Sequence, residues 1–147
     1  MSIPFYTAIP IFVGLSTQLI KFTIALATKK NISWRNFNDY GGFPSSHTAF
    51  TISLATVAYL VQGIDSLAFA ICAVIAIITI RDALGIRGYL SLHSTVLNKM
   101  AENFQFADKK FRFVHLEEQI GHHLNEIIGG GIIGIFLTIL YYKIFLG

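Results

Sequence analysis

The chain has 147 residues, of which 54% are hydrophobic and only 13% are charged, and its formal net charge is +3. Soluble domains carry roughly 25% charged residues, so this composition excludes an ordinary soluble domain and indicates that apolar side chains face lipid. The length fits one domain, the single cysteine excludes an intrachain disulfide framework, and the few basic residues form no stripe that would bind nucleic acid.

Four apolar segments are long enough, or nearly long enough, to cross a hydrocarbon core of about 30 Å as helices. They cover about residues 4–28, 47–62, 65–85 and 127–146. The first is too long for the core of a cleaved signal peptide and lacks a basic start, so we interpret it as a span. We therefore predict an all-α integral membrane helical bundle of about four transmembrane helices, forming a single domain over residues 1–147.

The connection before the last span, about residues 88–120, has a different composition that mixes charged residues with phenylalanines. About 30 residues without regular structure would be unusual for a loop. This mixture favours an amphipathic interfacial segment of one or two helices on the membrane surface. An ordinary connecting loop is the alternative.

The last span contains a run of small residues, Gly129–Gly134. Glycines let helix backbones approach each other closely in membranes, so we expect close helix packing here. Because four short spans make a small bundle, a homodimer through the same face is a further expectation.

The distribution of basic residues predicts the orientation of the bundle. The connection after the first span and the long connection before the last span carry basic residues, whereas the short turn between the second and third spans carries none. Basic connections stay in the cytoplasm, so the polar motifs beside them are expected on the cytoplasmic side of a bacterial inner membrane or an equivalent membrane. The basic residues concerned are Lys29, Lys30, Arg35, Arg81, Arg87, Lys99, Lys109, Lys110 and Arg112.

Several polar groups are therefore expected to converge at one end of the bundle. The motif Pro44–His47, with sequence PSSH, opens the second span directly after a pair of glycines and Phe43. A helix start with serine caps and free N–H groups binds an oxyanion well. Lys21 and Arg87 can neutralise the remaining charge, Arg87 with a bidentate fork. The alternative is a plain capped helix start with one interfacial histidine.

His122 and Glu126 form a second candidate pair. Four residues apart, they would share one face of a helix, where the carboxylate would fix the tautomer of the imidazole and sharpen its other nitrogen as a nucleophile or base. A polar start to the last span is the alternative. A longer helical stripe also offers a metal site, but it lacks close ligand pairs, so we predict no metal and no cofactor. The stripe consists of His115, Glu118, His122 and Glu126.

Together these motifs resemble the phosphatidic acid phosphatase type 2 superfamily, which includes the vanadium-dependent haloperoxidases. They are more similar to its divergent branch, the acid phosphatase/vanadium-dependent haloperoxidase-related proteins. The superfamily's order and spacing are followed by QLIK (Gln18–Lys21), GGFPSSHTA (Gly41–Ala49), DALGIR (Asp82–Arg87), LN (Leu97–Asn98) and GHHLNEIIGGGIIG (Gly121–Gly134). The superfamily's arginine six residues before the nucleophile is replaced by Leu116, and either Arg87 or Arg81 is the candidate substitute.

The resemblance implies roles for individual residues. It implies that His122 attacks phosphorus and forms a phosphohistidine, that Glu126 orients His122, and that His47 protonates the leaving alcohol. It also implies a set of phosphate-binding residues and two further candidates in the third span. The phosphate-binding residues are Ser45, Ser46, Lys21, Arg87 and Gly42, and the further candidates are Asp82 and Arg81.

The resemblance therefore implies a membrane lipid phosphate phosphatase that needs no metal. It would hydrolyse a phosphomonoester or diphosphate of an amphiphilic substrate, such as phosphatidate, phosphatidylglycerol phosphate or a polyprenyl phosphate, and its partners would be that substrate and membrane lipids. The alternative is a non-catalytic membrane protein that keeps the fold and binds anionic lipids, flips them, or acts as a scaffold.

Overall fold

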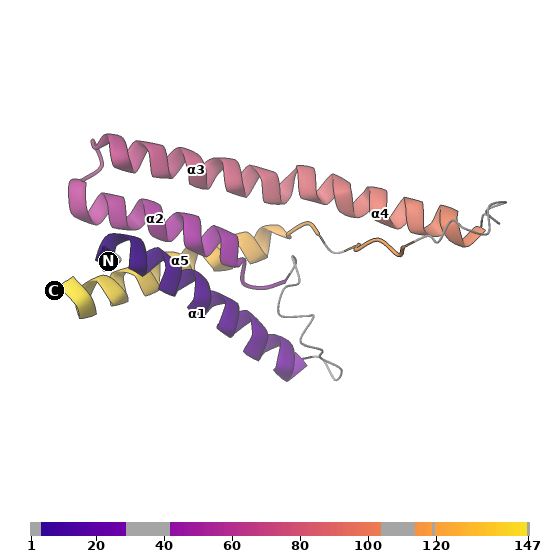
Figure 1. Ribbon diagram of the computed structural model, residues 1–147, viewed down its shortest axis with the longest axis horizontal. Coiled ribbons are helices and arrows are strands. Elements are labelled where there is room, and N and C mark those ends of the chain that lie inside the picture. Colours follow the sequence, from indigo (N-terminus) through magenta and orange to yellow (C-terminus); the bar gives the residue numbers. More distant parts are fainter. Residues whose placement is uncertain (1–3, 29–41, 104–113, 119, 147) are drawn as a thin grey trace.

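The computed structural model describes residues 4–28, 42–103, 114–118 and 120–146, and within these ranges it contains helices and no strands. The prediction of an all-α fold is confirmed (Figure 1). The chain order of the helices is α1 (Phe5–Thr28), α2 (Ser46–Gln62), α3 (Leu67–Leu84), α4 (Ile86–Asn103) and α5 (Leu124–Leu146).

The four predicted spans correspond to α1, α2, α3 and α5, but the number of membrane crossings is not settled at four. Within the described ranges, three helical stretches are long and apolar enough to cross a membrane, namely α1, the combined stretch Leu67–Asn103, and α5. The 17-residue α2 is shorter than these. It lies in the centre of the bundle, where it packs against α1, α3 and α5.

The boundaries of α2 and α3 follow from their capping residues. Ser45 is the N-cap of α2 and its hydroxyl accepts a hydrogen bond from the Thr48 amide. Gly63, with a φ of +82°, ends α2 in a conformation that glycine adopts at no steric cost. Ser66 then caps α3 by accepting a bond from the Phe69 amide. This tight turn places α3 antiparallel to α2 (Figure 1).

The seam between α2 and α5 is built from small residues, as the glycine run predicts. A Cβ added to Gly134 would lie 2.7 Å from the Ala49 carbonyl oxygen, and one added to Gly130 would collide with the Ser45 carbonyl. Further along the seam, the Thr138 hydroxyl donates to Ser53 Oγ at 2.6 Å. The expected close packing is confirmed, and it occurs within the chain. The expected homodimer therefore stays a prediction without an assigned surface.

The helix α4 continues α3 in almost the same direction and extends beyond the rest of the bundle (Figure 1). Of the predicted interfacial segment 88–120, residues 88–103 are helical as part of α4, whereas residues 114–118 and 120 are not helical. The backbone groups of Leu116 and Ile120 bond to side chains of α4. The basic residues Lys29, Lys30, Arg35, Lys109, Lys110 and Arg112, on which the predicted orientation partly rests, lie outside the described residues.

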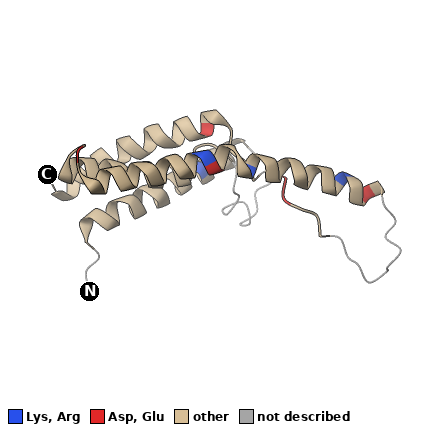
Figure 2. Cartoon of the chain, turned by 90° about the horizontal axis from the view of Figure 1, so that it is seen from above, with Lys and Arg blue, Asp and Glu red and all other residues tan. Residues whose placement is uncertain are grey.

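Among the described residues, charged positions are sparse along the bundle and gather where α3 meets α4 and further along α4 (Figure 2). Both ends of the chain lie at the opposite end of the bundle, close to the turn between α2 and α3 (Figure 1). The bundle thus has one polar end, formed by the end of α1, the start of α2, the end of α3 and the start of α5.

Candidate functional site

The entry to α2 brings Lys21 of α1 against the glycine-serine motif. Gly42 has a φ of +112°, and a Cβ added there would lie 3.1 Å from Lys21 Cε, so the lysine side chain reaches this turn. Ser46 donates its hydroxyl hydrogen to Gln18 Oε1 at 2.6 Å, which fixes α2 to α1 one turn before Lys21. The ring of His47 is exposed at the same place.

The first turn of α2 retains donors for an anion. The Ser45 amide donates to the Glu126 carbonyl, and the Thr48 amide donates to the Ser45 hydroxyl. The amides of Ser46 and His47 precede the Ala49 amide, which donates to the Ser45 carbonyl as the first bond of the helical ladder. Free N–H groups at a helix start favour a bound oxyanion. Ser45 itself is 1% exposed and its hydroxyl serves as the cap, so its contribution to such a site is to shape the turn.

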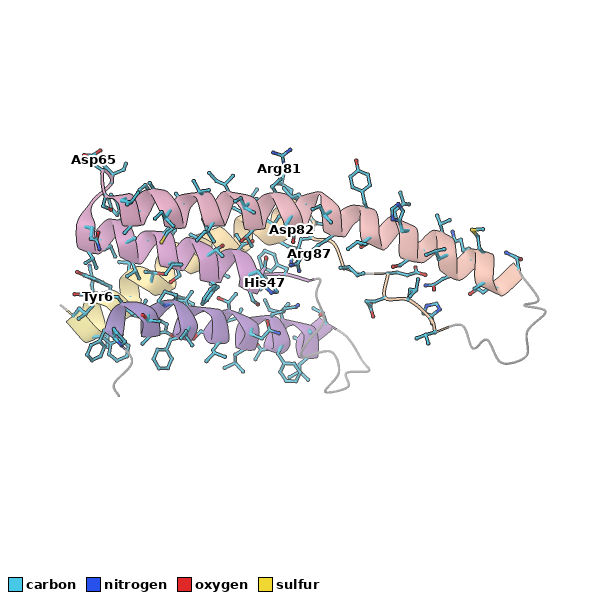
Figure 3. All side chains as sticks on the ribbon, turned by 45° about the horizontal axis from the view of Figure 1, so that its top comes forward. Tyr6, His47, Asp65, Arg81, Asp82 and Arg87 are labelled. Carbon is cyan, nitrogen blue, oxygen red and sulfur yellow. The ribbon has the colours of Figure 1, made fainter. Side chains whose placement is uncertain are left out.

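The junction of α3 and α4 places Arg87 beside His47. Arg87 Nε donates to Asp82 Oδ2 at 2.7 Å, which leaves the two terminal nitrogens of the guanidinium for another anion. The positive charge of Arg87 and the negative charge of Asp82 both act on the His47 ring. These three side chains lie together in Figure 3.

Arg81, the rival to Arg87, points away from this group (Figure 3). It lines an apolar groove of about 420 Å³ on α3 and at the junction with α4, together with Ile77, Ile80, Leu84 and Gly85. The structure therefore brings Arg87 and Asp82 to the polar end of the bundle beside His47, and it leaves Arg81 on a different face.

His122 reaches the same place from the extended segment before α5. Its amide donates to the Ala83 carbonyl at 3.2 Å, and the residue is 9% exposed. Burial lowers the pKa of His122 from its ordinary value of 6.5; the negative charge of Glu126 opposes this shift. The positive charges of Lys21, His47 and Arg87 lower the pKa further. The two histidines and the two cations thus lie within electrostatic reach of one another.

The prediction that His122 and Glu126 share one helical face is wrong. Helix α5 begins at Leu124, so His122 precedes it by two residues. Glu126 Oε2 accepts a bond from the His123 amide at 3.1 Å, which is the acidic half of a capping box. The His123 carbonyl accepts from the Glu126 amide in the first turn of α5. His122 Nδ1 is buried and has no hydrogen-bond partner among the described residues. Glu126 acts on His122 through its charge.

The alternative of a metal-binding stripe on one helix is also wrong, because His115 and Glu118 do not lie in a helix. Both bond to Asn98 of α4, on the arm of the molecule beyond the bundle. Among the described residues, no group of three or more His, Cys, Asp and Glu side chains is arranged to hold a metal ion.

Two residues that help to arrange the site, Gln18 and Asn98, were assigned no role from the sequence. Gln18 lies three residues before Lys21, so both face α2, and this spacing is a helical signal that sequence alone contains. Asn98 lies on α4, beyond the bundle, and is 2% exposed. Its partners are on a segment 17 to 20 residues away, and no local pattern indicates that contact.

These features define a class: an all-helical membrane protein in which histidines and cations converge at one end of an apolar bundle. The chain belongs to the divergent PAP2 family, whose model matches residues 4–137. It is also similar to "Uncharacterized membrane protein YuiD" of Bacillus subtilis (strain 168), with 35% identity over 133 residues that cover 84% of each chain. No solved structure matches the chain. The resemblance seen in the sequence motifs is therefore confirmed.

Proposed function

We propose that this protein is a membrane lipid phosphate phosphatase that works through a phosphohistidine on His122. The observation that supports the proposal is the convergence of His47 and His122, which come from different parts of the chain, with Lys21 and Arg87 at one end of an apolar bundle. Phosphoryl transfer needs mainly positioning and charge stabilisation, and this set of side chains supplies both.

The proposed reaction has two displacements. Neutral His122 attacks the phosphorus of a phosphomonoester or diphosphate, the P–O bond to the leaving group breaks, and protonated His47 gives its proton to the departing oxygen. Water then attacks the phosphohistidine while His47 accepts a proton, and inorganic phosphate leaves. The low pKa of His122 favours the neutral nucleophile that the first displacement requires.

The cations and the helix start would bind the phosphoryl oxygens in this mechanism. Arg87, held at its Nε by Asp82, presents its terminal nitrogens as a fork. Lys21 supplies a point charge, and the amides of Ser46 and His47 supply backbone donors. The substrate is an amphiphilic phosphate such as phosphatidate, phosphatidylglycerol phosphate or a polyprenyl phosphate.

A non-catalytic protein that binds or flips anionic lipids is the second candidate. The role of Glu126 favours it, since this carboxylate caps α5 through the His123 amide and leaves His122 Nδ1 without a hydrogen-bond partner. An imidazole without an orienting acceptor is a weaker nucleophile. Both candidates use the same cationic end of the bundle, and they differ in whether a covalent bond to His122 forms.

The test is phosphate release by the purified protein in detergent from a panel of lipid phosphates. We expect activity that persists in EDTA, inhibition by vanadate, and a loss of at least about a thousandfold in His122→Ala. The matched control is His123→Ala, since this neighbouring histidine has an exposed ring and contributes its backbone to the cap. Equal phosphate release by His122→Ala and the parent would exclude the phosphohistidine and leave the lipid-binding candidate.

The proposed membrane is a bacterial inner membrane or its equivalent, with the site on the cytoplasmic side. A Cys72→Ala background allows a single cysteine to be introduced at His47, which is exposed at the polar end, or at Ile64 in the turn at the other end. A membrane-impermeant maleimide added to intact cells should label the cysteine at 64 and not the one at 47. The reverse pattern would place the site on the outer side.

A further inference from the structure

Asn98 is the most heavily hydrogen-bonded side chain on the arm of the molecule that extends beyond the bundle. It is 2% exposed although neighbouring residues of α4 are exposed. Its Nδ2 donates to the Leu116 carbonyl at 2.9 Å and to Glu118 Oε1 at 2.7 Å, and its Oδ1 accepts from the Leu116 amide at 2.9 Å. Nδ2 also lies 3.3 Å from His115 Nε2.

Two further residues extend this contact along one face of α4. Thr95 donates to Glu118 Oε2 at 3.1 Å. Ser91 Oγ accepts from the amides of both Ile120 and Gly121, at 3.0 and 2.9 Å. Ser91, Thr95 and Asn98 are spaced as one helical face. Ser91 and Asn98 satisfy backbone groups that would otherwise be left to water, and Thr95 bonds to the Glu118 carboxylate.

The same line of contacts continues to His122. A Cβ added to Gly121 would lie 2.9 Å from Gly88 Cα, so the segment touches the backbone of α4 at that point. The next amide, that of His122, donates to the Ala83 carbonyl of α3. The residues before His122 are therefore attached to α4 and α3 over their described length, and the position of the imidazole depends on these attachments as well as on α5.

We propose that Asn98 is a positioning residue that holds residues 114–118 and 120–121 (the 114–121 segment) against α4, and that Ser91 provides a second attachment. These attachments place His122 beside His47 and Arg87. This inference rests on the proposed function for its catalytic consequence. Asn98 touches no substrate and acts through the segment. The hydrogen bonds from Asn98 and Thr95 lower the pKa of Glu118, which keeps the carboxylate ionised as the acceptor that the contact needs.

The experiment compares Asn98→Leu with the matched control Asn103→Leu. Asn103 lies on the same helix and is exposed, and its one side-chain bond to a described residue is to the Lys99 carbonyl of its own helix. Two readouts need no activity: hydrogen–deuterium exchange of the 114–121 peptides, and the rate at which diethylpyrocarbonate modifies His122. In Asn98→Leu we expect both rates to rise at least about tenfold, and in Asn103→Leu we expect parent values.

The kinetic readout is the split between kcat and KM for phosphate release. A displaced nucleophile lowers kcat by about tenfold to a hundredfold, while KM changes less than about threefold because Lys21 and Arg87 stay in place. Asn98→Asp should lose at least as much kcat, since it sets a second carboxylate against Glu118. The double variant Asn98→Asp/Glu118→Gln restores a donor–acceptor pair and should recover at least about threefold of that loss.

Each outcome decides between the proposals. Faster exchange and faster His122 modification in Asn98→Leu, in a parent that hydrolyses no lipid phosphate, would support the positioning role and reject the proposed function. Parent-like exchange, or parent-like kcat in an active protein, would overturn the positioning role. If Asn98→Leu does not fold, Ser91→Ala decides, since it removes one acceptor without adding volume. Unchanged exchange at residues 120–121 in that variant would overturn the proposal.

Discussion

The two histidines of the candidate site are held by two different kinds of structure. His47 stands at the start of α2, which is fixed by the glycine seam with α5, where backbones touch and almost no side-chain volume intervenes. His122 stands at the end of the 114–121 segment, which is fixed by polar side chains of α4 to its backbone. The seam between α2 and α5 requires residues without bulky side chains. The contact with α4 requires polar side chains that donate and accept hydrogen bonds.

The largest expected effect comes from adding volume to the seam. Gly134→Leu places a side chain against the Ala49 backbone, which cannot move without displacing α2, so we expect a loss of stability of about 3 kcal/mol, the upper end of the usual range for overpacking. The control is Gly131→Leu, because a Cβ at Gly131 meets nothing within 4 Å. Thermal unfolding in detergent measures both. A parent-like melting temperature in Gly134→Leu would contradict the seam.

The next effect concerns Arg87, at the start of the α4 arm. Arg87→Gln removes a charge-assisted contact to phosphate, worth about 1.5–3 kcal/mol, so vanadate inhibition should weaken by about tenfold to a hundredfold with no loss of fold. Asp82→Asn keeps Arg87 but removes the charge of its ion-pair partner. This variant should weaken vanadate inhibition less than Arg87→Gln does. The control is Arg81→Gln, because Arg81 lies on another face of α3. Vanadate should inhibit this variant as strongly as it inhibits the parent. Equal effects of the two arginines would reject the assignment of Arg87.

A smaller effect is expected in the pH profile. The pKa of His122 lies below 6.5, so its neutral, attacking form persists into acid and kcat/KM should fall only below pH 6.5. Lys21→Gln removes a positive charge that lowers this pKa, so the acid limb should move to higher pH. Glu126→Gln keeps a capping side chain and removes the charge that raises the pKa, so the limb should move to lower pH.

The control for the pH experiment is Lys143→Gln, in the last turn of α5, which should leave the midpoint unchanged. Shifts of the same sign in the Lys21 and Glu126 variants would contradict the electrostatic arrangement, whatever happens to the maximal rate.

The smallest effect tests the polar component of the seam. Thr138→Val removes the hydroxyl that donates to Ser53 at almost constant volume. Hydrogen bonds between membrane helices contribute about 0.6 kcal/mol on average, so the melting temperature should fall only slightly. A loss comparable with that of Gly134→Leu would mean that the hydroxyl pair, and not the absence of volume, holds the two helices together.

Much of the fold could be predicted because its signals are local. The apolar runs mark α1, α2, α3 and α5 to within a few residues, Ser45 has the chemistry of an N-cap, and the glycine spacing indicates a close helix contact. The convergence of polar groups at one end follows from the alternation of the helices.

The sequence predictions were wrong or incomplete where contacts between distant parts of the chain determine the structure. Helix α5 begins at Leu124, directly after His123, whose amide donates to Glu126, and histidine is not among the preferred N-cap residues that would mark a start. Residues 114–118 and 120–121 are not helical, and side chains of α4, Asn98 and Ser91, bond to the backbone of Leu116, Ile120 and Gly121. Arg81 and Arg87 are six positions apart, about 120° around a continuous helix, and sequence alone does not say which direction faces His47.

The length of helix α3 also indicates how deep in the membrane the candidate site lies. It belongs to a stretch apolar enough to cross a bilayer, and from Leu67 to Ala83, where the His122 amide is attached, it rises about 24 Å. That distance approaches the hydrocarbon thickness of about 30 Å, so a phosphorus bound beside His122 lies near the boundary with the headgroups. A lipid can deliver its phosphate there while its chains remain among the neighbouring acyl tails, whereas a water-soluble ester has to leave the aqueous phase to arrive.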